Sequence, residues 1–171
     1  MDAQSLDEFG RAAADPAAVA AVVRAAESAR REVSERDGTK VHDDIAILRA
    51  IPNIKVVAPT DPWEAAELTV QMADIPGPKY LRLDKGKAGL PEKREEVIFG
   101  KGRTVADGRD VTLVATGAIL SEALTAGERL REAGYSVRVL ALHTLKPVDE
   151  NLIVAAARET GGLVTVEEHT V

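Results

Sequence analysis

One histidine stands where it could transfer a proton. His42 directly precedes a segment with a helical pattern, and Asp37-Gly38 lies just ahead of it in the chain. An imidazole exchanges protons near neutral pH, so a histidine that faces a substrate can act as an acid or a base. The simpler interpretation is that His42 is a polar residue at a helix N-terminus and that Asp37-Gly38 forms a turn. The residues alone leave both interpretations open.

Two further segments carry residue types that are found in binding sites. Thr116-Gly117 separates an apolar strand from a helix, and helix N-termini attract phosphate. A single glycine is not the three-glycine dinucleotide fingerprint, and a tight strand-to-helix turn is sufficient reason for it. Glu167-Glu168-His169 contains metal-ligand types, but adjacent residues at a strand end point to opposite faces and do not easily converge on one ion. We therefore assign no metal ligand.

The composition narrows the classes of function. The chain has 171 residues, with 28 acidic against 22 basic side chains and a formal charge of −6, which argues against nucleic acid or an anionic membrane as the main partner. Cysteine is absent, which excludes disulfides, thiolate zinc sites and cysteine nucleophiles. No run approaches the roughly 20 apolar residues that span a bilayer. We expect a globular, cytoplasmic protein.

Alternating helices and strands must position these residues. Asp15-Pro16 and Asp61-Pro62 are helix-start signals, because Asp caps free N–H groups and Pro fits the first turn. The predicted helices cover 17–35, 43–50, 63–73, 121–133 and 149–158, and the predicted strands cover 54–58, 79–83, 111–115, 137–142 and 163–166. The charged stretch 84–96 has no apolar period and is predicted to be a linker.

The last part of the chain is predicted to form a parallel sheet. Three apolar strands joined by helices predict such a sheet with helices on its faces. Because the strand over 163–166 comes directly before the last residues, it leaves a sheet edge that needs cover. We expect either that a partner chain supplies this cover or that the chain is a fragment.

The amino-acid sequences of several turns resemble those of transketolase-type enzymes, and they occur in the same order along the chain. Residues 43–53, 57–64 and 77–83 resemble the end of the family's pyrimidine-binding domain. Residues 110–117, 143–147 and 164–169 resemble its C-terminal domain. Ordered matches at separate turns are hard to obtain by chance. Within the family, the chain is most similar to the stand-alone C-terminal subunit of split, two-chain transketolases, in truncated form.

This resemblance implies a fold and a division into domains. The fold class is α/β, with a partial thiamine-diphosphate pyrimidine-domain sheet followed by a Rossmann-like, three-layer C-terminal domain. We expect a helical arm over 1–38, the partial pyrimidine-binding domain over 39–90 and the C-terminal domain over 91–171.

The resemblance also implies a chemistry that the chain cannot complete alone. Transketolases transfer a two-carbon ketol unit on thiamine diphosphate, held with magnesium between two domains, and the cofactor supplies the difficult chemistry. The Gly-Asp-Gly signature of the diphosphate domain and the segment that carries the activating glutamate are both missing from this sequence. We expect no cofactor to bind this chain alone, and we expect a homo- or hetero-oligomer with an N-terminal transketolase subunit that carries the diphosphate-binding domain.

By resemblance, three residues are assigned to the sugar-phosphate substrate. The family places its substrate histidine in an Asp-Gly-Pro-Thr-His context, and here Asp37-Gly38 matches but the spacing to the helix is about two residues short. Asp37 and His42 would hydrogen-bond a ketose, with His42 as the catalytic residue. Lys85 would meet the sugar phosphate as a point charge where the family has an arginine. Otherwise His42 is a polar helix-start residue, which the short loop favours, and Lys85 is an exposed linker lysine.

Other polar residues have structural interpretations. Asp61 is predicted to cap a helix, and Arg82 is predicted to pair with an acidic neighbour. His143 and Lys146 lie in a family turn concerned with packing and dimer contacts, so they are assigned no chemistry. The functional alternatives are a non-catalytic remnant or dimerisation module, and a fragment related to deoxyxylulose-phosphate synthases or to the beta subunits of 2-oxo acid dehydrogenases.

Overall fold

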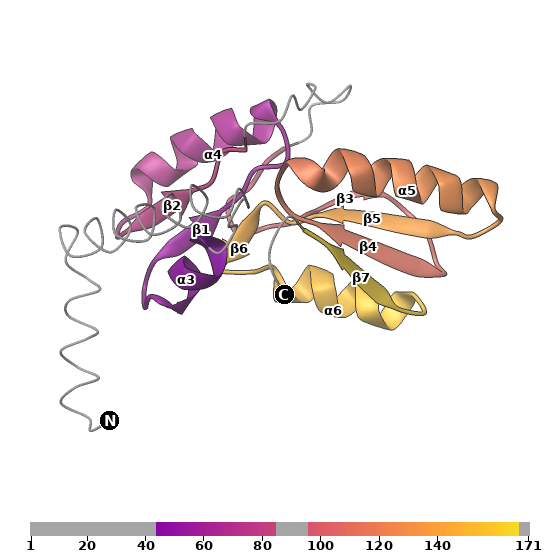
Figure 1. Cartoon of the computed structure of the whole chain (residues 1–171). Helices are drawn as coiled ribbons and strands as arrows, with labels where there is room; N and C mark the ends of the chain where they lie inside the picture. The colour runs from indigo at the N-terminus through magenta and orange to yellow at the C-terminus, as the bar shows by residue number, and fades with distance from the viewer. Residues whose placement is uncertain (1–43, 85–95, 168–171) are drawn as a thin grey trace, which may run out of the picture. The chain divides into compact units, whose positions relative to one another are not determined.

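The computed structural model describes residues 44–84 and 96–167 (Figure 1). These residues form two compact units: one contains 44–56 and 76–80, and the other contains 57–75, 81–84 and 96–167. The helix predicted over 17–35 lies outside the described residues, and so does most of the linker predicted over 84–96. The domain division proposed from the sequence stays a prediction.

The first unit is built around helix α3 (Asp44–Ala50). Ile45 and Leu48 are buried on one side of this short helix. The Tyr80 hydroxyl donates to Asp44 Oδ2 over 2.7 Å and thereby fixes the first residue of the helix. Strands β1 (Lys55–Val57) and β2 (Lys79–Leu81) each begin in this unit and end in the other.

The second unit begins with helix α4 (Pro62–Asp74), whose start was predicted from its Asp-Pro pair. The Asp61 side chain caps it, because Oδ1 accepts from the Glu64 backbone N–H at 2.8 Å, so the predicted capping role is confirmed. Leu68 and Met72 pack with Val57 and Val97 in a buried cluster, which also contacts Trp63. These apolar contacts hold the inner face of α4.

A four-stranded sheet of order β3-β5-β4-β7 forms the rest of this unit. The strands are β3 (Arg103–Ala106), β4 (Val111–Ala115), β5 (Val137–Ala141) and β7 (Leu163–Val166). Strand β4 pairs in parallel with β5 and with β7, which confirms the predicted parallel sheet. Strand β3 adds an antiparallel edge beside β5. Neither β3 nor the short strand β6 (Thr144–Lys146) was predicted.

Helices cover both faces of this sheet, so the unit has three layers (Figure 1). Helix α5 (Leu120–Glu132) follows the short 3-10 helix η1 (Gly117–Ile119), and α6 (Glu150–Glu159) follows β6. Leu113 and Val139 pack in the cluster that contains α5 residues. Their sequence neighbours Val114 and Leu140 pack in the cluster that contains α6 residues, as the alternation of side chains along a strand requires. The predicted α/β class is confirmed.

Candidate functional site

The residues predicted from the sequence to contact substrate lie outside the described part of the chain. Asp37 and His42 precede Asp44, the first described residue, and Lys85 directly follows Asp84. Their assignments therefore stay predictions. What the structure adds is the arrangement of polar residues around the carboxyl ends of β4 and β5, the edge at which α/β sheets place their sites.

A fully buried carboxylate, that of Glu64, lies in the first turn of α4. Its Oε2 accepts from the Thr60 backbone N–H at 2.7 Å and from the Thr60 hydroxyl at 2.8 Å. Its Oε1 accepts from Arg103 Nε at 2.8 Å and also from Arg103 Nη2. A buried carboxylate is stable only when it is paired and its lone pairs are satisfied, and these four donors meet that requirement.

Arg103 reaches this carboxylate from strand β3 and joins a second acid. Its Nη2 lies 3.6 Å from Oδ2 of Asp61, the residue that caps α4. Both side chains are almost completely buried, as is that of Glu64. The buried charges are therefore two carboxylates and one guanidinium. Their sum is one negative charge, which is unusual for groups removed from water.

His143 lies beside these charges and is fully buried. Its backbone carbonyl accepts from the Ala58 N–H at 2.8 Å, and its Nδ1 lies 2.9 Å from the Thr144 hydroxyl, which accepts from the Gly100 N–H at 3.1 Å. Its Nε2 has no hydrogen-bond partner among residues 44–84 and 96–167. Burial lowers the pKa of His143 below its ordinary value; Glu64 acts in the opposite direction, and Arg103 adds to the lowering.

The sequence left open whether the Thr116-Gly117 turn binds phosphate. In the structure, a carboxylate of the chain itself holds this turn. Asp84 Oδ2 accepts from the Ala118 N–H at 3.0 Å, and Asp84 Oδ1 lies 3.2 Å from Arg82 Nε. Gly117 has φ +76°, and a Cβ there would lie 2.9 Å from Asp84 Oδ2. The glycine is explained by this turn, and the predicted pairing of Arg82 with an acidic neighbour is confirmed.

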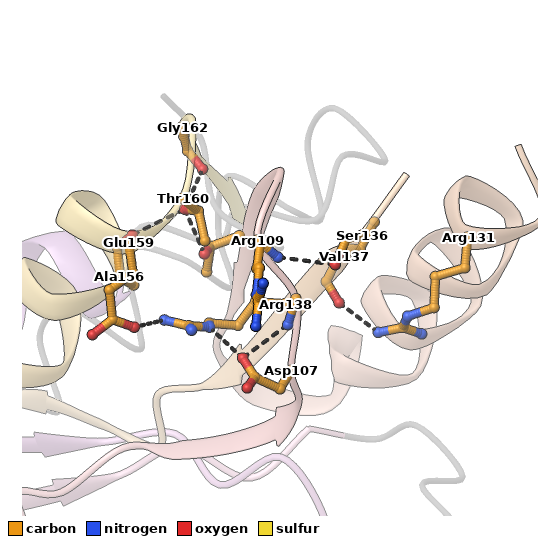
Figure 2. Close-up of polar contacts among 12 residues, drawn as sticks. Asp107, Arg109, Arg131, Ser136, Val137, Arg138, Ala156, Glu159, Thr160 and Gly162 are labelled. Carbon is orange, nitrogen blue, oxygen red and sulfur yellow. Dashed lines mark hydrogen bonds and ion pairs between the residues drawn. The ribbon is translucent and has the colours of Figure 1, made fainter. Parts of the chain in front are cut away.

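A second ionic network lies at the opposite end of the parallel strands (Figure 2). Arg138, near the start of β5, contacts Asp107 at 2.8 Å and Glu159 at 2.6 Å. Two hydrogen bonds lower the pKa of Asp107: the one from the Gly108 N–H has the larger effect, and the one from the Arg138 side chain adds to it. Asp107 and Glu159 are 77% and 56% exposed, and the amino end of a parallel sheet is not where such folds bind ligands. We interpret this network as structural.

The described residues form no metal centre. Within residues 44–84 and 96–167, no group of three His, Cys, Asp or Glu side chains could hold a metal ion. Glu167 is exposed, whereas Glu168 and His169 lie outside the described residues. The described helices include none that is long and apolar enough to cross a membrane.

Comparisons with known proteins find transketolases and related enzymes. Residues 100–171 match the model of the transketolase C-terminal domain. The chain is 41% identical over 131 residues to one of the subunits of the apulose-4-phosphate transketolase of Phocaeicola vulgatus, a match that covers 74% of this chain and 41% of the relative. Residues 100–171 thus match a transketolase C-terminal domain, and most of the chain is similar to a transketolase subunit. The chain is also 40% identical over 138 residues to a 1-deoxy-D-xylulose-5-phosphate synthase of Syntrophotalea carbinolica, which covers 78% of this chain and 22% of that enzyme.

A solved structure supports the same assignment. The chain resembles a split gene transketolase, described as an inactive beta4 tetramer, with a TM-score of 0.69 and 37% identity over 76% of this chain and 44% of that one. The resemblance stated from the sequence is thus confirmed, including its placement in the C-terminal section of the family. The chain spans less than half the length of each of these relatives.

Sequence reasoning missed the buried group of Glu64, Arg103 and His143. Asp61-Pro62 showed where α4 begins, and Glu64 stands at the third position of that helix, where a glutamate commonly helps to cap it. An arginine at the start of an unpredicted strand gave no signal of its own. Glu64 alone is therefore a weak signal, because an exposed glutamate that helps to cap a helix has the same sequence pattern.

Proposed function

We propose that this chain is a transketolase-type subunit that takes part in thiamine-diphosphate-dependent, two-carbon ketol transfer between sugar phosphates. The observation that carries the proposal is the 41% identity to a subunit named for an apulose-4-phosphate transketolase. The similarity to a split gene transketolase supports it. Such a fold places its ligands at the carboxyl ends of its parallel strands. In this chain these are the ends of β4 and β5, where Asp84 accepts from Ala118 in the turn before α5.

The residues of the described part do not fit the cofactor by themselves. Thiamine diphosphate needs a magnesium ion for its diphosphate, and residues 44–84 and 96–167 offer no group of three ligating side chains. At the turn before α5, the anion-binding backbone N–H of Ala118 already donates to Asp84. We therefore derive no step through the cofactor. In the complete assembly, a partner chain that carries the diphosphate-binding domain would hold it with magnesium.

The contribution of this chain is proposed to be substrate binding. Asp37 and His42 would hydrogen-bond the hydroxyls and carbonyl of the ketose, and the His42 imidazole would take or give a proton at the substrate oxygen. Lys85 would bind the phosphate group through its single charge. The described residues adjoin these positions in sequence: Asp44, held by Tyr80, begins the helix after His42, and Asp84, held by Arg82, precedes Lys85.

A reconstitution assay tests the proposal. The purified chain, an N-terminal transketolase subunit with the diphosphate domain, and their mixture are each supplied with thiamine diphosphate, magnesium, a ketose phosphate and an aldose phosphate. We expect ketol transfer in the mixture alone, and calorimetric titration of the isolated chain with thiamine diphosphate should show no saturable binding. Micromolar binding by the isolated chain would contradict the need for a partner. Failure of the mixture in every sugar combination would favour a non-catalytic dimerisation module.

The identity to a deoxyxylulose-phosphate synthase supports a second candidate reaction. The same mixture is therefore also supplied with pyruvate and glyceraldehyde 3-phosphate. Release of carbon dioxide with formation of deoxyxylulose phosphate, without ketol transfer between sugars, would replace the transketolase proposal by this one.

Variants then test the three residues in the active mixture. His42→Asn should lower kcat, whereas Lys85→Gln should raise KM for phosphorylated sugars and spare unphosphorylated ones. The matched control is Lys101→Gln, because Lys101 is an exposed lysine whose ion-pair partner Asp149 lies 3.8 Å away. Equal effects of Lys85→Gln and Lys101→Gln would remove Lys85 from the phosphate site. Placement of the assembly in the cytoplasm is part of the same proposal.

A further inference from the structure

The buried charges at the start of α4 are not balanced without a further proton. Glu64 and Asp61 carry two negative charges and Arg103 carries one positive charge, all in side chains that are almost completely buried. His143 is a titratable group beside this cluster: burial has the largest effect on its pKa, followed by the charges of Glu64 in α4, Arg103 in β3 and Asp61 at the α4 cap. The cluster therefore contains one group whose charge is not fixed near neutral pH.

The hydrogen bonds of His143 fit the neutral imidazole better than the cation. The Thr144 hydroxyl accepts from the Gly100 N–H, so its own proton is available for His143 Nδ1, 2.9 Å away. In the cation both ring nitrogens are donors, and that contact would have to reverse. The Nε2–H has no acceptor among the described residues in either form, so the two forms differ at Nδ1 and in the charge that the buried ring carries.

A protonated His143 would therefore compete for carboxylates that are already engaged. Glu64 accepts from Thr60 and Arg103, and Asp61 accepts from the Glu64 N–H. In the present arrangement neither carboxylate accepts from His143 Nε2, so we infer that an imidazolium would draw one of them toward the ring and away from its present donors. Both carboxylates hold the first turn of α4, so the change would be felt there.

We propose that His143, Asp61, Glu64 and Arg103 form a proton-responsive joint that fixes the first turn of α4 when the imidazole is neutral and loosens it when the imidazole is protonated. The inference concerns a regulatory feature of the fold and does not depend on the reaction proposed above. The Ala58 N–H that donates to the His143 carbonyl connects the same histidine to the segment that leads into α4.

Nuclear magnetic resonance of the full chain tests the joint directly. The chain has three histidines, so a His42→Gln, His169→Gln variant leaves His143 as the sole imidazole and keeps every residue of the cluster. Nitrogen-15 spectra between about pH 8 and pH 4.5 report its tautomer and titration, since the range brackets an ordinary imidazole pKa near 6.5. The amide signals of Thr60 and Glu64, which donate to the two carboxylates, report the first turn of α4.

We expect His143 to be neutral with its proton on Nε2 at pH 8, and to become protonated only below the ordinary range. The Thr60 and Glu64 amides should then shift with the same midpoint as the imidazole. The Gly108 amide, which donates to Asp107 at 2.8 Å outside this cluster, serves as the internal control and should not follow that midpoint. In His143→Gln the shared transition should disappear.

Two results would overturn the joint. One is titration of His143 while the Thr60 and Glu64 amides stay unchanged. The other is persistence of the amide transition in His143→Gln, which would assign it to a carboxylate. If His143→Gln does not fold, the comparison of midpoints in the single-imidazole variant still decides the question.

Discussion

Replacing Arg103 by methionine should destabilise the protein strongly, because it leaves Glu64 buried without a counter-charge. Glu64 is 0% exposed, and two of its four donors belong to Arg103. Removing one partner of a buried ion pair costs about 3–5 kcal/mol. Thr60 would still donate twice, which does not neutralise the charge. We expect a loss of about 3–5 kcal/mol in the free energy of unfolding.

The matched control is Arg138→Met, because Arg138 also makes two close ion pairs. Its contacts with Asp107 and Glu159 measure 2.8 and 2.6 Å, but those acids are 77% and 56% exposed. Exposed pairs contribute about 0–1 kcal/mol each. The Arg138 variant should therefore lose much less stability than the Arg103 variant, although the two arginines have pairs of similar length.

Urea unfolding at pH 7.5 measures both variants with one intrinsic probe. The chain has a single tryptophan, and Trp63 packs against the cluster beneath α4, so its fluorescence reports this unit. Glu64→Leu, Arg103→Met removes both charges and should be more stable than Arg103→Met alone, by about 1–3 kcal/mol. Equal losses in Arg103→Met and Arg138→Met, or a double variant less stable than Arg103→Met, would refute the reasoning.

Three further predictions use the same unfolding assay. Burial lowers the pKa of His143, so as the pH falls the imidazole is protonated in the unfolded chain before it is protonated in the folded one. The contribution of His143 to the free energy of unfolding should therefore be complete above about pH 6.5, and below that pH it should fall by at most about 1.4 kcal/mol per pH unit. His143→Gln should remove that component of the slope, and an unchanged slope would contradict it. Gly117→Ala should cost about 2–3 kcal/mol, because its φ is +76° and a Cβ would lie 2.9 Å from a carboxylate oxygen of Asp84. Gly134→Ala, with φ +94° and open space around the Cβ, should cost about 1–2 kcal/mol, so equal losses would exclude the close contact as the cause. Leu140→Ala should cost about 2–5 kcal/mol, because Leu140 is fully buried. Val164→Ala should cost less than about 1 kcal/mol, because that side chain is 48% exposed. Similar losses in the two variants would contradict the assignment of the core.

The elements that sequence reasoning predicted well share one property, which is that local residues determine them. The runs at 111–115 and 163–166 are short, apolar and bounded by turns, and both became strands with the predicted limits. Helix α4 was predicted because its Asp-Pro start is local. Apolar runs and caps act over a few residues, so a sequence shows them directly.

The elements that were missed depend on distant residues. Strand β3 begins with Arg103 and has exposed positions at its centre, so it lacks an apolar run and is held by pairing with β5. The Glu64–Arg103 pair joins residues 39 positions apart. No local pattern announces such a pair, because its stability comes from burial that the remainder of the fold provides.

Residues that stabilise this chain can be tested separately from those proposed to act on substrate. Variants of Arg103 or Leu140 should change unfolding of the isolated chain, because both side chains are buried. If His42 and Lys85 contact substrate as proposed, their variants should change the reconstituted activity and leave unfolding of the isolated chain unchanged. A His42 variant that lost stability as severely as Arg103→Met would show that His42 is a structural residue. The proposed substrate site would then lose its catalytic member.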